Sequence, residues 1–292
     1  MTVDRKQLFG AFAAMIFVGA SWGANLPVTK VMLRYFDLIP MAAVRIAAAT
    51  LALALLLWLV EGRRALKLDV GFGRFLWLGL LMGGFFVVYA TGIHFSNPIS
   101  AATVRLATGA RFDPGFGVAL ALNVLGGLIL VSSTFANAPL TLGGGEIVVL
   151  LSNAIWTLYS IKAQLWFDRT SQLQRTYVAS LSATGWLVLV AMVLVMSGRS
   201  ASPFGESDAW VWTQLLVVAV LASGVGGYMW NIGASRLGVA VASLWVNLVP
   251  FCAVLWSMVY GFMPNAFQIV GGLVALAGVV YMQWRKLRSA PR

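Results

Sequence analysis

Long apolar stretches separated by short polar breaks dominate the pattern of this chain. The longest stretch without Asp, Glu, Lys or Arg is Leu237–Trp284. Because about 20 apolar residues cross a hydrocarbon core once, this stretch predicts two membrane-spanning helices, with a turn at the Pro-containing segment Gly261–Phe267. The first helix carries Ser243, Asn247 and Pro250 on one face. Such a polar stripe favours packing against protein or water over contact with lipid.

The rest of the chain repeats this pattern of apolar runs and polar breaks. It predicts further crossings at residues 7–29, 39–60, 75–95, 115–135, 146–167, 177–196 and 210–235. A fourth crossing is expected between the third and the fifth, giving ten in all. We therefore expect an all-α polytopic membrane protein with ten transmembrane helices.

Composition agrees with this pattern and excludes other classes. Hydrophobic residues make up 60% of the chain, charged residues only 10%, and the mean hydropathy is +0.88. The net charge of +11 does not indicate nucleic-acid binding, because the cations lie in short segments between apolar runs, as the positive-inside rule produces. The single cysteine, Cys252, allows no disulfide within the chain and no Cys-based metal site.

The distribution of cations predicts the orientation. With ten crossings, the side that carries both termini receives most of them: Arg5, Lys6, Arg63, Arg64, Lys67, Arg74, Arg105, Arg111, Arg169, Arg175, Arg236, Arg285, Lys286, Arg288 and Arg292. The opposite side receives only Lys30, Arg34 and Arg199. Since positive loops stay in the cytoplasm, we expect a multi-pass protein of the bacterial cytoplasmic (inner) membrane with both termini cytoplasmic.

The two halves of the chain resemble each other. Trp22 matches Trp156 and Val44 matches Val178 at a spacing of 134 residues. The segment LGGLIL (Leu125–Leu130) matches LAGVVY (Leu276–Tyr281) at a spacing of 151. Two units of five spans each, residues 1–135 and 136–292, would enter the membrane from opposite faces and form an inverted repeat, the usual plan of secondary transporters.

The same alignment predicts that the fourth span is incomplete near residues 99–105. The spacing between matching residues is 141 for Gly92 and Gly233, but it is 151 for the segments Leu125–Leu130 and Leu276–Tyr281. The first half therefore lacks about ten residues between these two matches. What remains, Ile99–Val104, is too short to cross a membrane. Either this span is broken, or residues are missing from the sequence at this place, and the regular alternation of loop charges favours the second interpretation.

Several motifs resemble a known family. They are SWGANLPVTK (Ser21–Lys30), PMAAVRIAAAT (Pro40–Thr50), YATGIHFSNPISAA from Tyr89, GASRLGVAVASLWVNLVP and the closing GGLVALAGVVY. Together they resemble the drug/metabolite transporter superfamily, EamA type. The resemblance implies a ten-helix exporter of metabolites with a central cavity, and within the family the chain is most similar to bacterial aromatic amino acid exporters.

Polar and aromatic residues at helical spacing in the predicted spans are the candidate substrate contacts. They are Asn25, Phe86, Tyr89, His94, Trp156, Tyr159, Tyr228, Ser243 and Asn247. Each has a structural alternative: hydrogen bonding between helices for Asn25 and His94, and packing or lipid anchoring for the aromatic residues. For Arg45, structural pairing is the favoured interpretation, and no catalytic or metal-binding residues are expected.

The positions of the acidic residues distinguish facilitative from proton-coupled transport. All nine acidic residues fall at or near the ends of predicted spans, whereas proton-coupled carriers commonly place one within the membrane. We therefore expect a facilitative exporter of neutral amphipathic metabolites, aromatic or other neutral amino acids first. A proton-coupled exporter of drugs or cationic compounds is the alternative. An enzyme is not expected, nor are cofactors or nucleic acid; the partners are the substrate and lipid, and the protein is expected as a monomer or weak dimer.

Overall fold

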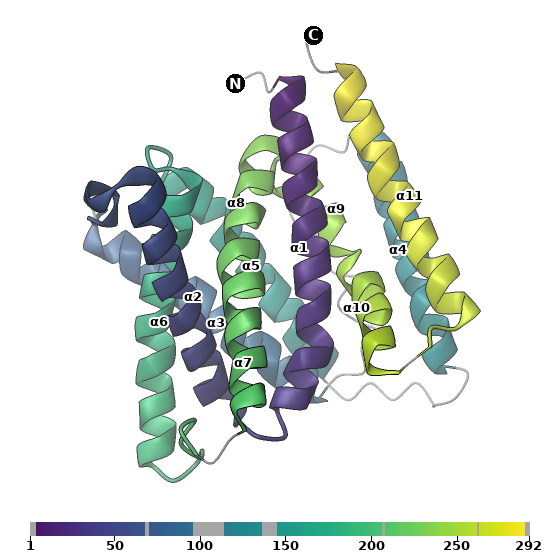
Figure 1. Ribbon diagram of the computed structural model, residues 1–292. Coiled ribbons are helices and arrows are strands. Elements are labelled where there is room, and N and C mark those ends of the chain that lie inside the picture. Colours follow the sequence, from purple (N-terminus) through teal and green to yellow (C-terminus); the bar gives the residue numbers. More distant parts are fainter. Residues whose placement is uncertain are drawn as a thin grey trace.

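The fold was analysed in a computed structural model, which describes residues 4–67, 70–95, 114–135, 145–205, 208–261 and 263–289. Every regular element in these ranges is helical (Figure 1). The long helices are α1 (Arg5–Met32), α2 (Leu38–Glu61), α3 (Phe72–Phe95), α4 (Pro114–Phe135), α5 (Gly145–Trp166), α6 (Gln172–Met196) and α11 (Ala266–Ser289). Four shorter ones, α7 (Ala209–Val218), α8 (Gly226–Leu237), α9 (Val239–Val246) and α10 (Val249–Ser257), complete the bundle.

Helices of membrane-spanning length confirm the predicted fold class. Seven described helical stretches are long and apolar enough to cross a membrane: Arg5–Met32, Leu38–Glu61, Phe72–Tyr89, Gln172–Met196, Ala209–Leu237, Val239–Ser257 and Ala266–Arg288. The protein is therefore a multi-pass membrane protein. The predicted spans 7–29, 39–60, 75–95, 177–196 and 210–235 coincide with five of these stretches. Those at 115–135 and 146–167 coincide with α4 and α5, which are helical but are not among the seven. The predicted break near residues 99–105 lies outside the described residues, so the count of ten crossings stays a prediction.

Local sequence explains where helices begin and end. At the start of α1, the Asp4 side chain accepts a hydrogen bond from the Gln7 amide, and the Gln7 side chain accepts one from the Asp4 amide. This reciprocal capping box satisfies two amides that the first helical turn leaves free. Gly238 separates α8 from α9 with a φ of 82°, a conformation that glycine adopts without strain. Lys286 Nζ then donates to the Leu237 carbonyl oxygen at 2.7 Å.

Two spans contain internal irregularities. The stretch from α7 to α8 passes through a π-helical segment, Ala219–Val225, at its centre. The stretch from α9 to α10 is interrupted at Asn247 and Leu248. Pro250 accounts for the second, because it has no amide hydrogen to donate to the Val246 carbonyl. Both irregularities lie within the membrane-spanning length, where bundles of transporters accommodate them only against protein or a cavity.

Small residues allow close packing between pairs of helices. α4 lies alongside α11 at one edge of the bundle (Figure 1). A Cβ atom on Gly126 would lie 2.5 Å from the Gly271 carbonyl oxygen, and one on Gly271 would lie 2.5 Å from the Gly126 carbonyl oxygen. Gly79 similarly lies against Ser182 of α6, whose hydroxyl donates to the Phe75 carbonyl oxygen at 2.8 Å. These contacts bring the backbones together, as glycines do in membrane bundles.

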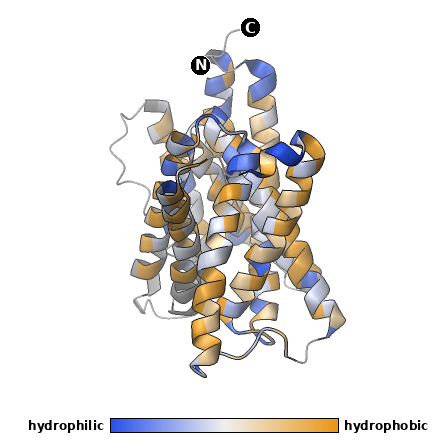
Figure 2. Cartoon of the chain, turned by 90° about the vertical axis from the view of Figure 1, so that its left-hand side faces the viewer, coloured by the Kyte–Doolittle hydropathy of each residue, from blue (hydrophilic) through white to orange (hydrophobic). Residues whose placement is uncertain are grey.

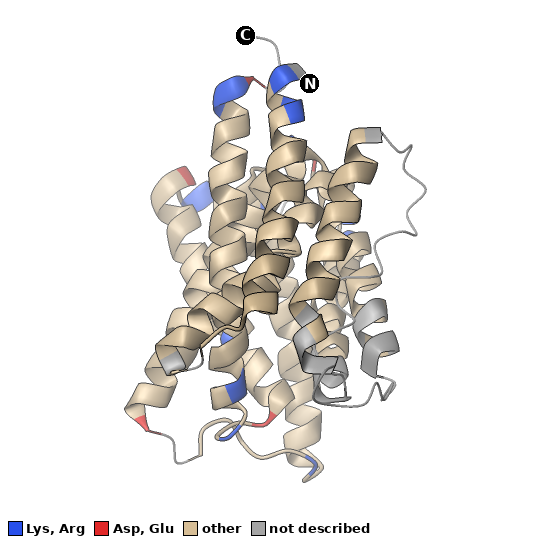
Figure 3. Ribbon diagram, turned by 90° about the vertical axis from the view of Figure 1, so that its right-hand side faces the viewer, with Lys and Arg blue, Asp and Glu red and all other residues tan. Residues whose placement is uncertain are grey.

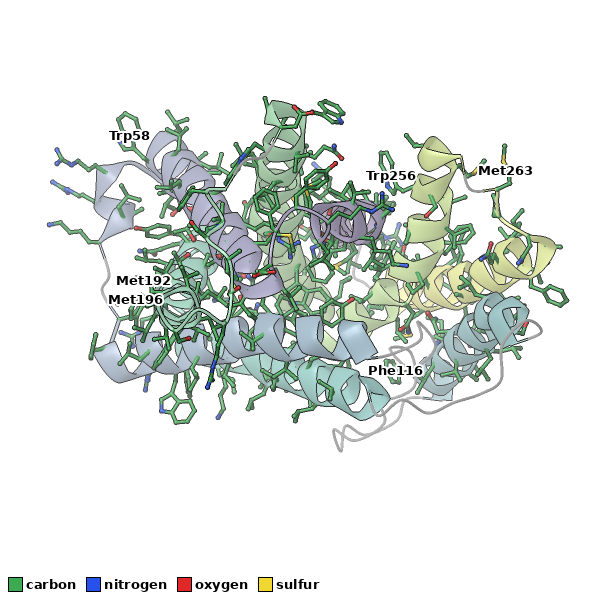
Figure 4. The ribbon with its side chains drawn as sticks, turned by 90° about the horizontal axis from the view of Figure 1, so that it is seen from below. Trp58, Phe116, Met192, Met196, Trp256 and Met263 are labelled. Atoms are coloured by element: carbon green, nitrogen blue, oxygen red, sulfur yellow. The ribbon has the colours of Figure 1, made fainter. Side chains whose placement is uncertain are left out.

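The outer surface and the helix ends differ in polarity. Hydrophobic residues cover the middle of the helices and hydrophilic residues gather toward their ends (Figure 2). Charged residues concentrate near the helix ends, and the N and C termini lie at the same end (Figure 3). Seen from below, the large apolar side chains of Trp58, Trp256 and Met263 lie on the periphery (Figure 4). Such a surface suits contact with lipid tails.

Candidate functional site

Three tryptophans from three helices meet at the centre of the bundle. Trp22 of α1, Trp156 of α5 and Trp230 of α8 have ring centroids 5.5 Å apart for Trp22 and Trp156, and 5.7 Å for each of the other two pairs. These separations fall in the favourable range for aromatic pairs. Trp22 lies in the middle third of the stretch Arg5–Met32 and Trp156 in the middle third of α5, whereas Trp230 lies in the last third of the stretch Ala209–Leu237. The contact therefore forms inside the bundle, away from the helix ends.

Aromatic residues of α3 and α5 extend this contact. The Phe85 ring lies 4.8 Å from the Trp156 ring and 5.4 Å from that of Tyr89, which stacks on it, while Phe86 lies edge-on to Phe85 at 5.2 Å. Tyr159 lies 4.9 Å from Trp156. The aromatic cluster is defined here by these rings: Trp22, Phe85, Phe86, Tyr89, Trp156, Tyr159 and Trp230.

The three indole N–H groups of the aromatic cluster have different environments. Trp22 Nε1 donates to the carbonyl oxygen of Ala222, in the π-helical segment, at 2.9 Å. Trp230 Nε1 donates to the Ser160 hydroxyl at 3.1 Å. Trp156 Nε1 is buried and has no hydrogen-bond partner among the described residues. A buried donor without a partner costs free energy, so the Trp156 N–H is available to an acceptor that enters the site.

A buried arginine lies beside the aromatic cluster. Arg45 of α2 is 8% exposed, and its guanidinium carbon lies 5.9 Å from the centre of the Phe86 ring, within cation–π range. Its Nη1 donates to Asn25 Oδ1 at 3.0 Å and to Thr29 Oγ1 at 3.2 Å. Thr29 Oγ1 also donates to Asn25 Oδ1 at 3.1 Å. Asn25, Thr29 and Arg45 are called the Arg45 cluster below.

The Arg45 cluster lacks a counter-charge from the described chain. Arg45 Nε is buried and makes no hydrogen bond to any described residue. The described carboxylates lie at helix ends, and that of Asp37, the nearest along α2, accepts from the Ser200 hydroxyl at 2.8 Å and the Ala201 amide at 2.6 Å. A buried cation without an ion-pair partner is costly and uncommon, which makes Arg45 a candidate for ligand binding.

A second buried arginine joins neighbouring helix segments through its Nη groups, although its Nε also has no hydrogen-bond partner among the described residues. Arg175, near the start of α6, donates to the side chains of Gln164 and Gln172 and to the Phe167 carbonyl oxygen. Gln164 in turn donates to Asn231 Oδ1 of α8 at 3.3 Å. These bonds connect the α5–α6 junction to α8. Among the described residues, no group of three His, Cys, Asp or Glu side chains comes together as a metal site.

The structure brings together some of the predicted site residues. Phe86, Tyr89, Trp156 and Tyr159 belong to the aromatic cluster, and Asn25 reaches it through Arg45. Tyr228 instead packs on the α2–α6 contact beside Leu53, Leu57 and Leu173.

The other predicted contacts lie elsewhere or cannot be placed. Ser243 is buried within α9, and Asn247 is half-buried at the interruption between α9 and α10. No recorded contact joins either of them to the aromatic cluster within the described part of the chain. His94 lies in α3, but its side chain is outside the described residues.

Sequence reasoning left Trp22, Phe85 and Trp230 out of the predicted site and interpreted Arg45 as structural. A signal existed for two of them. Trp22 matches the predicted contact Trp156 in the other half of the chain, so a pair across the repeat could have been expected. Arg45 is a cation well inside an apolar span, which in a membrane protein is a functional candidate by default. Phe85 and Trp230 carry no comparable signal, because apolar aromatic residues occur on every face of these helices.

Membrane-spanning helices around a buried aromatic and polar centre define a multi-pass membrane protein with an internal site. Comparison with known proteins makes this specific: the chain belongs to the EamA-like transporter family, whose model matches residues 8–110 and 143–284. The protein is thus a membrane transporter of the drug/metabolite transporter superfamily.

The names of two similar proteins call them transporters and give no substrate. The "Uncharacterized transporter YyaM" of Bacillus subtilis (strain 168) is 23% identical over 88% of this chain and 88% of its own. The "Uncharacterized transporter YrdR" of the same organism is 22% identical over 95% of this chain and 92% of its own. A solved crystal structure covers 98% of this chain and 99% of its own with a TM-score of 0.75 and 15% identity, so it shows the shared fold alone.

Proposed function

We propose that this transporter exports small neutral amphipathic metabolites, aromatic amino acids first, by alternating access. The aromatic cluster carries the proposal, because seven rings from four helices converge inside the bundle. Transporters of this architecture bind substrate between their helices, near the middle of the membrane. Flat apolar surfaces of this kind suit a ring or a branched apolar side chain. The polar groups of Asn25 and Thr29 beside them suit the zwitterionic end.

The proposed architecture is ten helices arranged as two inverted five-helix repeats, residues 1–135 and 136–292. The family match in two segments, one in each half, supports it. So does the contact between Trp22 and Trp156, which are equivalent at the spacing of 134 residues. Equivalent residues can touch each other only where they lie on the two-fold axis that relates the repeats, so this contact would mark the axis.

The energy source in this proposal is the substrate gradient. The carboxylates of the described residues, Asp4, Asp37, Glu61, Asp168 and Asp208, all lie at helix ends or just beyond them. A carboxylate inside the membrane is the usual proton carrier of a coupled transporter. With none at mid-depth in the described helices, facilitative export is the mode that the residues support.

The proposed location is the cytoplasmic membrane of a bacterium with both termini in the cytoplasm. The shared position of the termini supports an even number of crossings (Figure 3). Cations of the described chain gather at that end, among them Arg5, Lys6, Arg285 and Arg288. The positive-inside rule then assigns this end to the cytoplasm.

Uptake into proteoliposomes tests the function. Purified protein would be given radiolabelled phenylalanine, tryptophan and a cationic dye, with and without an imposed pH gradient. Saturable amino acid uptake that is independent of the gradient is the expected result. Dye uptake that requires the gradient, without amino acid uptake, would replace this proposal with a proton-coupled exporter of cationic compounds.

A matched pair of variants connects uptake to the site. Trp156→Ala removes the ring that contacts four others in the aromatic cluster. We expect it to lower amino acid uptake at least tenfold, because aromatic contacts contribute about 0.5–1.5 kcal/mol each. Trp77→Ala changes a ring that is largely exposed on the outer face of α3 and should leave uptake within about twofold of the unchanged protein.

A further inference from the structure

Two buried hydrogen-bond donors at the aromatic cluster and the Arg45 cluster have no acceptor within the described part of the chain. Arg45 Nε and Trp156 Nε1 are both buried donors without a partner among the described residues. They come from α2 and α5 and are joined by the Phe86–Phe85 contact, since Arg45 lies on Phe86 and Phe85 lies on Trp156. Buried donors are nearly always satisfied in proteins. A ligand that satisfies these two must bring oxygen acceptors.

The geometry of Arg45 narrows the choice of acceptor. Nη1 donates to Asn25 and Thr29, whereas Nε, which shares the other edge of the guanidinium with Nη2, is buried and has no hydrogen-bond partner among the described residues. That edge presents two parallel N–H groups, which match the two oxygens of a carboxylate. The hydrogen bonds to Nη1 fix the plane of the guanidinium, so the edge is oriented before a ligand arrives.

The positive charge of Arg45 also favours a carboxylate as the ligand group. Arg45 is buried without a carboxylate partner in the described chain, and its guanidinium lies over the face of the Phe86 ring. An anionic group entering the site would supply the missing counter-charge, whereas an amine would bring a second positive charge beside the first. Like charges in a poorly solvated site repel strongly.

We propose that Arg45 is the carboxylate receptor of this transporter, so that its substrates are amino acids whose carboxylate pairs with the Nε–Nη2 edge while their apolar part lies on the aromatic cluster. This inference rests on the proposed function and specifies its substrate class. Asn25 and Thr29 are positioning residues that hold the guanidinium. Amines that lack a carboxylate, including apolar cations, are excluded.

Three ligands with the same ring separate the contributions of their end groups. Binding of 3-phenylpropionate, 2-phenylethylamine and phenylalanine to the purified full-length protein would be measured by calorimetry. The unchanged protein should bind 3-phenylpropionate and phenylalanine and should bind 2-phenylethylamine at least tenfold more weakly. Equal affinity for 3-phenylpropionate and 2-phenylethylamine, or no binding of either carboxylate, would overturn the proposal.

Asn25→Asp tests the receptor without removing the arginine. The new carboxylate would occupy the place of the Asn25 amide, 3.0 Å from Arg45 Nη1, and would neutralise the guanidinium from inside the protein. We expect 3-phenylpropionate affinity to fall about 10- to 100-fold, with thermal stability unchanged or raised. A structural arginine would give the stability result without the loss of binding, and unchanged affinity in this variant would contradict the proposal.

Two further variants complete the design. Arg45→Lys keeps the charge but loses the planar edge, and it should weaken 3-phenylpropionate binding at least tenfold. Lys30→Gln removes an exposed cation next to Thr29 and should bind like the unchanged protein, since surface charge is screened.

Uptake by the unchanged protein keeps the two proposals distinguishable. Arg45-dependent carboxylate binding without amino acid uptake would refute the proposed function alone. Amino acid uptake that retains its ligand preference in Asn25→Asp would refute the carboxylate receptor alone.

Discussion

The hydroxyl oxygens of Thr50 and Thr184 lie 2.9 Å apart, and the two residues are separated by 134 positions along the chain. The same spacing relates Trp22 to Trp156, whose rings are also in contact. Thr50 lies on α2 and Thr184 on α6, which would be the second helices of the two proposed repeats. Two self-matching contacts at one spacing support a single two-fold axis through the bundle.

Replacing these threonines by valine tests the contact. Each hydroxyl also lies 2.8 Å from a carbonyl oxygen one turn earlier in its own helix, that of Ile46 or Ser180. Since each hydroxyl has one hydrogen, only one of the pair can donate across the interface. We expect each single variant, Thr50→Val or Thr184→Val, to cost about 0.5–1 kcal/mol, and a double-mutant cycle to give a coupling of about 0.6 kcal/mol.

The measurement is thermal unfolding in detergent with all four members of the cycle. Coupling would be seen as a double variant less destabilised than the sum of the single ones. Strict additivity would show that the hydroxyls do not interact and would remove one of the two contacts on the proposed axis.

The close approach of α4 and α11 predicts a large difference between two glycines of one helix. A side chain at Gly126 would meet the backbone of Gly271 and Ala275, whereas nothing lies within 4 Å of a Cβ at Gly117. Gly126→Leu should therefore destabilise the protein by about 1–3 kcal/mol or more, because the helices must move apart. Gly117→Leu is the control and should be near neutral in the same unfolding assay. Equal effects of the two changes would contradict the packing described for α4 and α11.

The junction between α5 and α6 depends on one buried side chain. Arg175→Leu leaves the Phe167 carbonyl and the Gln164 amide oxygen without their charged donor. Charged hydrogen bonds contribute about 1.5–3 kcal/mol each when a partner is removed, so the unfolding free energy should fall by about 2 kcal/mol or more. Arg169→Leu, in the exposed turn before α6, should change it by less than about 0.5 kcal/mol. If the two variants were equally stable, the hydrogen bonds of Arg175 would not contribute to the unfolding free energy.

The bond from Trp22 to the π-helical segment gives a further test. Trp22→Phe keeps an aromatic ring in the cluster but deletes the donor to the Ala222 carbonyl. A π-helical turn leaves carbonyls out of the regular pattern, so the loss should destabilise the protein by about 1 kcal/mol and speed hydrogen exchange of amides in Ala219–Val225. Trp77→Phe, which alters an outward-facing ring, should leave exchange there unchanged. Unchanged exchange in Trp22→Phe would show that the π segment is held by other contacts.

The sequence predicted the spans well and the site only in part, for physical reasons. Hydrophobic length alone sets the ends of a crossing, so α2 was predicted as residues 39–60 and is Leu38–Glu61. Helical periodicity gives the residues that share a face of one helix, but it does not say which neighbouring helix that face meets. Tyr228 and Trp230 are two positions apart on α8, and one packs on Leu53 and Leu57 while the other enters the aromatic cluster.

The environment of Arg45 also could not be predicted from the sequence of its own helix. Its partners Asn25 and Thr29 lie on the preceding helix, and only the tertiary structure reveals that no described carboxylate reaches it. The sequence pattern places Pro250 on one face of a single helix, whereas the structure divides that helix into α9 and α10. The aromatic stripe at Trp156 and Tyr159, by contrast, could be read directly from its spacing, since α5 is regular throughout its described length.

The Arg45 cluster has no counterpart in the second half of the chain. At the spacing of 134 residues, Asn25, Thr29 and Arg45 correspond to Tyr159, Ala163 and Ala179. A bundle built from two matching halves would thus carry a charged polar cluster on one side of its two-fold axis only. This cluster lies in the part of the bundle remote from the termini (Figure 1). A molecule with a charged head and an apolar tail would then fit one way round. During export it would travel head first, with its orientation set before either gate moves.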